Sequence, residues 1–180
     1  MTCDRRYAPR ISFPPYSYVP GRFPHPLNDP RGHSYRAPGE SHTDSLEAVE
    51  QNRYAVDLWN AGYYWEAHEA WESLWHSAGR TGAVADLYKG LIKLAAAGVK
   101  VREGLPNGVT RHLARASELF ASVLAQVGDT TFAEHRPKPL FGLAETLAAR
   151  NAVRSIETIV PDGASVVIVW PERIALAEPA

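Results

Sequence analysis

The chain of 180 residues has a single cysteine and no long apolar run. Cys3 cannot form an intramolecular disulfide, which excludes a cysteine-bridged scaffold and fits a reducing compartment. No stretch approaches the ~20 apolar residues of a membrane span, and the N-terminal MTCDRRYAPR lacks the apolar core of a signal peptide. We therefore expect a cytoplasmic protein with no membrane partner.

An excess of either charge is also missing. The chain carries 19 lysines and arginines against 20 aspartates and glutamates, so it lacks the positive field of a dedicated nucleic-acid binder. No serine lies in a G-x-S-x-G elbow, and Gly79, Gly82 and Gly90 lack the spacing and the lysine of a phosphate-binding loop. These absences argue against nucleophilic catalysis and against nucleotide binding through the common motifs.

Proline and charge are unevenly distributed. Residues 1–43 hold 8 of the 14 prolines and six arginines against three acidic residues, whereas the remainder carries 13 basic and 17 acidic residues. Because proline donates no backbone hydrogen bond, this segment is predicted to be extended and turning. Its aromatic residues and its opposite charge predict an arm that packs on the body, with a free recognition tail as the alternative. The aromatic residues placed among its prolines are Phe13, Tyr16, Tyr18, Phe23 and Tyr35.

From residue 44 onward, apolar residues recur at spacings of three and four, as in amphipathic helices. A capping-box-like start at Asp44 and Glu47 opens the first helix, which ends near Asn60. Further helices are predicted over 63–79, from 81 or 82 onward, and from 107 to just before Gly128. Because the connections are short, successive helices are expected to lie antiparallel.

The C-terminal part is predicted to hold a fifth helix, over 143–153, and a β-hairpin. The segment SIETIVPDGASVVIVWPERIAL alternates in polarity and is rich in valine and isoleucine on both sides of Pro161-Asp162-Gly163. The predicted fold class is thus mainly α: an antiparallel four-helix body with an extended proline-rich N-terminal arm and a small C-terminal helix plus β-hairpin. We divide the chain into an arm packed on the body (1–43), a helical bundle domain (44–127) and a C-terminal extension (128–180).

The second predicted helix carries the residues best suited to chemistry. His68, Glu72 and His76 follow one another at intervals of four residues, so they share a ridge that Glu69 flanks. Tryptophans 65, 71 and 75 surround this ridge. Since burial against apolar surfaces disfavours a charged carboxylate, Glu69 and Glu72 require a cation, a hydrogen-bond donor or a metal.

Two interpretations of this ridge remain open. In the first, it is an internal polar network, in which Lys89 and Lys93 pair with the glutamates and His68 donates to Glu72 or Tyr88. In the second, His68, Glu69 and Glu72 bind zinc, manganese or iron, with His76 or His112 completing the ligand set. The spacing His68-Glu69-x-x-Glu72 is not the two-histidine H-E-x-x-H pattern. The candidate cluster comprises His68, Glu69, Glu72, Trp65, Trp75, Tyr88, Lys89 and Lys93.

The stretch LWNAGYYWEAHEAWESLW, followed by DLYKGLIKLAAAGVKVREGLPNG, resembles the family catalogued as domain of unknown function 309. The resemblance covers roughly residues 44–125 and implies a small all-helical bundle without an assigned reaction. Lys89 and Lys93 stand where the family often has glutamine, which favours charge pairing over a shared metal. The matching residues are Trp59, Asn60, Gly62, Tyr64, Glu66, Ala67, His68, Glu69, Glu72, Leu74 and Trp75, then Gly90, Leu91, Ile92, Ala95 and Asn107.

From these observations we predict a structural or interaction module with a buried His/Glu/Trp cluster, and we expect no cofactor. Whether the chain is an enzyme stays open, and a non-enzymatic role is favoured. Homodimerisation through the bundle is left open, because the tryptophans are dense enough to cover a partner surface. The alternative is a metal-dependent, hydrolase-like enzyme that uses His68, Glu69 and Glu72. Contact of the arm arginines with single-stranded nucleic acid is a third, less favoured hypothesis.

Overall fold

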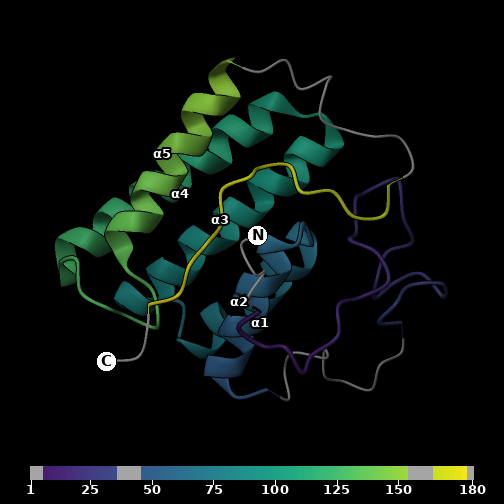
Figure 1. Ribbon diagram of the computed structural model, residues 1–180, viewed down its shortest axis with the longest axis horizontal. Coiled ribbons are helices and arrows are strands. Elements are labelled where there is room, and N and C mark those ends of the chain that lie inside the picture. Colours follow the sequence, from purple (N-terminus) through teal and green to yellow (C-terminus); the bar gives the residue numbers. More distant parts are fainter. Residues whose placement is uncertain (1–5, 36–45, 154–163, 178–180) are drawn as a thin grey trace.

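The computed structural model describes residues 6–35, 46–153 and 164–177 (Figure 1). These residues form five α-helices and no β-strand. Each helix packs against the next one along the chain, and α3, α4 and α5 run as one layer beside the α1–α2 pair (Figure 1). The helices are α1 (Ala48–Asn60), α2 (Tyr64–Ser77), α3 (Gly82–Glu103), α4 (Pro106–Val127) and α5 (Pro137–Val153).

The mainly helical prediction is confirmed, and local signals explain where several helices begin and end. Helix α3 ends at Gly104, whose φ of 73° lies in the left-handed region that glycine adopts at low cost. Pro106 opens α4 in the first turn, where the missing amide of proline has no helical partner to lose. Helix α5 begins at Pro137, six residues before the predicted start, because prolines in a first turn do not interrupt a helix.

Helix α3 is the central helix of the bundle, and its small residues allow close contact on two sides. A Cβ atom at Gly98 would lie 2.5 Å from the ring of Tyr64 on α2. A Cβ atom at Gly90 would lie 2.5 Å from the ring of Phe120 on α4. Both rings are almost fully buried, so the packing of α3 against its neighbours depends on these glycines.

Residues 6–35 run without helix or strand and contact α1 and α2. Asp57 of α1, 3% exposed, accepts hydrogen bonds from the backbone amides of Tyr7 (2.9 Å) and Ala8 (2.8 Å). The Tyr54 hydroxyl donates to the carbonyl oxygen of Ser12 at 3.0 Å. The ring of Phe13 stacks on those of Tyr54 and Tyr63. The division of the chain at residues 43 and 127 stays a prediction.

The predicted β-hairpin is wrong for the described part of the chain. Residues 164–177 form no strand, and the Pro161-Asp162-Gly163 turn lies outside the described residues. Two backbone amides of residues 164–177 are bound by side chains of α1 and α2 instead. Tyr64 Oη accepts from the amide of Val169 (3.0 Å), and Asn60 Oδ1 from that of Ile174 (2.8 Å). The apolar residues of this segment therefore pack against the helices, and the segment does not pair with another strand.

None of the helices in the described residues combines the length and the apolar character that crossing a membrane requires.

Candidate functional site

Helix α2 turns two different faces to its surroundings. Its core face carries Ala67, Ala70, Trp71 and Leu74, each at most 3% exposed. His68, Glu69 and Glu72 occupy the flank of the helix and are partly exposed. The side chain of His68 is 26% exposed and that of Glu69 is 36% exposed, so solvent reaches the cluster.

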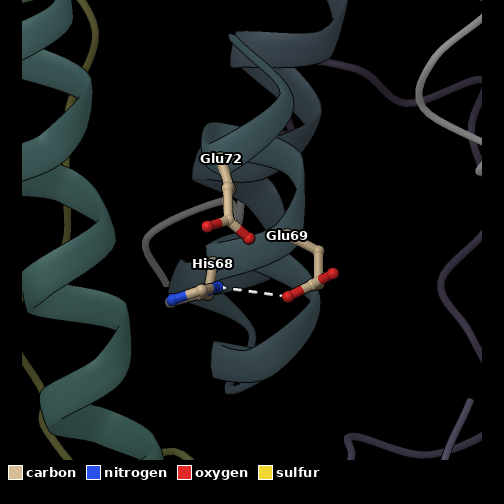
Figure 2. Close-up of side chains that lie close together, drawn as sticks. All are labelled: His68, Glu69 and Glu72. Carbon is tan, nitrogen blue, oxygen red and sulfur yellow. Dashed lines mark hydrogen bonds and ion pairs between the residues drawn. The ribbon is translucent and has the colours of Figure 1, made fainter. Parts of the chain in front are cut away.

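The three side chains of this flank converge (Figure 2). One ligand atom from each of His68, Glu69 and Glu72 lies within 4.8 Å of the other two. His68 Nδ1 is 3.2 Å from Glu69 Oε1, the contact that Figure 2 marks with a dashed line. One imidazole nitrogen and two carboxylate oxygens form a donor set suited to zinc, manganese or iron. Because all three residues belong to one helix, they approach an ion from one side.

Lys89 and Lys93 do not form the predicted ion pairs with Glu69 or Glu72 among the described residues. Instead, Lys89 Nζ lies 5.6 Å from the centre of the Trp75 ring, where the negative face of the indole attracts a cation. Glu72 has no hydrogen bond or ion pair within the described part of the chain. The acceptor oxygens of Glu72 are therefore available.

Two further residues of the candidate cluster lie apart from it. Tyr88 is 8% exposed and belongs to the core, where burial raises the pKa of its hydroxyl and the charge of Glu134 adds to the effect. The ring of Trp65 meets the arm, because the rings of Tyr18 and His25 contact it at centroid distances of 5.2 and 5.7 Å. Trp65 thus contributes to docking the arm.

The two histidines considered as additional ligands differ in position. His76 is exposed and lies outside the converging group, and its Nδ1 accepts from Arg80 Nε at 2.7 Å. His112 of α4 is partly buried, and its pKa is lowered first by burial and then by the positive charges of Lys93, Lys100, Arg111 and His68. Its imidazole is thus neutral at pH 7, the form that binds a metal or accepts a proton.

The buried polar residues outside the His68, Glu69 and Glu72 cluster were not singled out by the sequence. They bind backbone amides and carbonyls of distant segments, and helical periodicity does not reveal such partners. Glu66 is the one that the sequence could have indicated, because it lies inside the family phrase directly before Ala67 and His68. The residues concerned are Asn52, Asp57, Glu66, Arg102 and His135, all buried.

The fold and the converging side chains of α2 define a helical-bundle protein with a candidate metal-binding cluster on one helix. Residues 53–112 match the model of the family described as Domain of unknown function (DUF309). The match confirms the resemblance drawn from the sequence and includes α2, α3 and the three cluster residues. The comparisons with curated proteins and with solved structures found no match.

Proposed function

We propose that this helical bundle is a structural or interaction module that holds a divalent transition-metal ion through His68, Glu69 and Glu72. The observation that carries the proposal is the convergence of three ligand atoms within 4.8 Å on a partly exposed helix flank. Two carboxylates so close repel each other when both are charged, and a bound cation relieves that repulsion.

The open character of the site supports an interaction role. Three ligands from one helix leave coordination positions for water or for a donor from a partner surface. Lys89 is held over the Trp75 ring and does not neutralise the glutamates. Homodimerisation through the bundle, which the sequence left open, is one way to supply such a donor, and sedimentation with and without metal tests it.

Metal-dependent hydrolysis is the second candidate function. A metal ion with an open position lowers the pKa of a bound water and so generates a nucleophile at neutral pH. The observation that favours it is His112, whose lowered pKa leaves a proton acceptor within the electrostatic reach of His68. In this case His112→Ala abolishes turnover and leaves metal binding in place.

The metal proposal is tested by stripping the purified protein with a chelator and titrating zinc, manganese and iron(II) separately. We expect one ion per chain and a rise in melting temperature. His68→Ala should weaken binding by at least about 100-fold, since even the loss of groups that merely orient a ligand costs about 10–100-fold.

His76→Ala is the matched control, because His76 is exposed and lies outside the converging group. It should bind metal like the unchanged protein. Equal binding by the His68→Ala protein, or no binding by the unchanged protein, contradicts the proposal. The second result leaves a metal-free structural module.

A further inference from the structure

A second group of polar side chains is separate from the exposed flank of α2. It is buried where the arm meets the helices. Ser17 is 1% exposed, Arg102 2% and Glu66 7%. Four of their atoms have no hydrogen-bond partner among the described residues: Ser17 Oγ, Glu66 Oε2, Arg102 Nε and Arg102 Nη1. Buried polar atoms are rarely left unpaired, and charged ones least of all.

Backbone contacts bring these three side chains to one junction. The amide of Tyr18 donates to Glu66 Oε1 at 2.8 Å, and the amide of the preceding Ser17 donates to the carbonyl of Ser165 at 3.0 Å. Arg102 Nη2 donates to the carbonyl of Ala164, the neighbour of Ser165, at 2.8 Å. Ser17 is thus next to Tyr18, which binds Glu66, and it is hydrogen-bonded to Ser165, whose neighbour Ala164 binds Arg102.

Glu66 and Arg102 sense each other's charge without touching. Burial first and then the nearby Arg22 lower the pKa of Arg102, and the charge of Glu66 opposes this shift. No ion pair joins Glu66 to Arg102 in the described part of the chain. The junction therefore holds a buried guanidinium and a buried carboxylate that do not pair with each other, each with atoms left without a hydrogen bond.

We propose that this junction binds a small carboxylic acid that also carries an amine or a hydroxyl group, such as an α-amino or α-hydroxy acid. Arg102 binds the carboxylate of the ligand, and Glu66 Oε2 accepts a hydrogen bond from its amine or hydroxyl. Ser17 Oγ is free to donate or accept. The free donors and acceptor of the protein are thus matched by those of the ligand.

The arm segment 16–35 is the cover of this site. Glu66 Oε1 accepts from the Tyr18 amide and lies 3.4 Å from His33 Nε2, so the carboxylate that binds the ligand also holds the arm. Phe23 places its ring 5.9 Å from the Arg102 guanidinium carbon. Because the unpaired atoms are enclosed, a ligand enters only when this segment lifts.

The test uses the full chain after chelator treatment, so that the α2 cluster plays no part. The common L-amino acids, lactate and malate are screened at millimolar concentration by the shift in melting temperature, and binders are quantified by calorimetry. Acetate and ethylamine are the probe controls, because each carries only one of the two groups. We expect at least one amino or hydroxy acid to bind with a saturable shift, at least 10-fold more tightly than either control.

Arg102→Met and Glu66→Gln are the diagnostic variants. Each should weaken binding of the best probe by at least 10-fold, whereas Arg111→Met, an exposed change on α4, should not. Arg102→Met is expected to keep the melting temperature of the free protein, since it replaces an incompletely paired buried cation by an apolar chain of similar length. The proposal is overturned if no panel member binds. It is also overturned if the Arg102→Met and Glu66→Gln proteins bind the best probe as tightly as the unchanged protein does.

Discussion

Asn52 connects three parts of the fold through one buried amide. Its Oδ1 accepts from Trp71 Nε1 at 3.2 Å and lies 3.0 Å from His135 Nε2. Because an indole nitrogen only donates, the oxygen of Asn52 is the acceptor and His135 Nε2 must carry its proton. His135 Nδ1 has no partner among the described residues, so the ring is held neutral.

His135 makes stability depend on pH. Burial lowers its pKa to about 3 in the folded protein, from 6.5 in an exposed histidine. Between these values the unfolded chain binds the proton and the folded chain does not. The free energy of unfolding therefore falls as the pH drops below 6.5, by up to about 1.4 kcal/mol per pH unit from this residue.

Urea denaturation between pH 7 and pH 5.5 measures this slope, and His135→Gln should reduce it. His76→Ala is the control, since His76 is exposed and its loss should leave the slope in place. An unchanged slope in the His135→Gln protein would show that other groups cause the pH dependence.

At the scale of single residues, the sequence predicted which side chains share the flank of α2 but not what they contact. His68 and Glu72 are one helical turn apart, and this spacing alone brings them together. Lys89 does not pair with Glu69 or Glu72, because it lies against the Trp75 ring instead. The position of that ring relative to Lys89 depends on how α2 meets α3.

Among the structural elements, the arm has the most specific attachment. Asp57 accepts from the amides of Tyr7 and Ala8 and is 3.3 Å from Arg6 Nε. Two backbone donors and a guanidinium thus share one buried carboxylate. Proline content predicted an irregular segment, whereas its path was set by the few carboxylates on α1 and α2 that accept its amides.

Asp57→Asn should destabilise the protein by about 2–3 kcal/mol, because hydrogen bonds to a charged acceptor are lost and a buried donor faces a donor. Urea denaturation measures the change, and limited proteolysis reports whether the arm is cleaved faster. Glu118→Gln makes the same chemical change in an ion pair whose glutamate side chain is 63% exposed, and should cost less than about 1 kcal/mol. Similar losses in the two variants would mean that Asp57 does not anchor the arm.

On the scale of the whole molecule, residues 164–177 contact both the helices and the arm. Trp170 stacks on Trp59 at 6.2 Å and meets Tyr64 edge-on at 5.9 Å. The backbone also passes so close to the turn between α1 and α2 that a Cβ atom at Gly62 would lie 2.6 Å from the carbonyl oxygen of Val167. The amide of Leu176 donates to the hydroxyl of Tyr7 at 3.3 Å, which links this segment to the arm.

Trp170→Ala should lower the free energy of unfolding by about 3–5 kcal/mol, the usual cost of removing a buried tryptophan side chain. Ile168→Ala is the matched control from the same segment, because Ile168 is 57% exposed, and it should change stability by less than about 0.5 kcal/mol. Denaturant unfolding of both variants distinguishes a segment that completes the core from one that only covers it. Equally small effects of the two substitutions would show that the segment does not complete the core.

The sequence by itself determined the helices, the family resemblance and the residues that share one flank of α2. Helical hydrogen bonds join residues four apart, so glycine, proline and apolar spacing suffice to locate them. Only the tertiary structure decided that residues 164–177 lie along the bundle without pairing as a strand. It also decided that Asp57 and Glu66 hold the arm and that Arg102 faces a buried junction. Such contacts join residues tens of positions apart, and their partners exist only once the helices have packed.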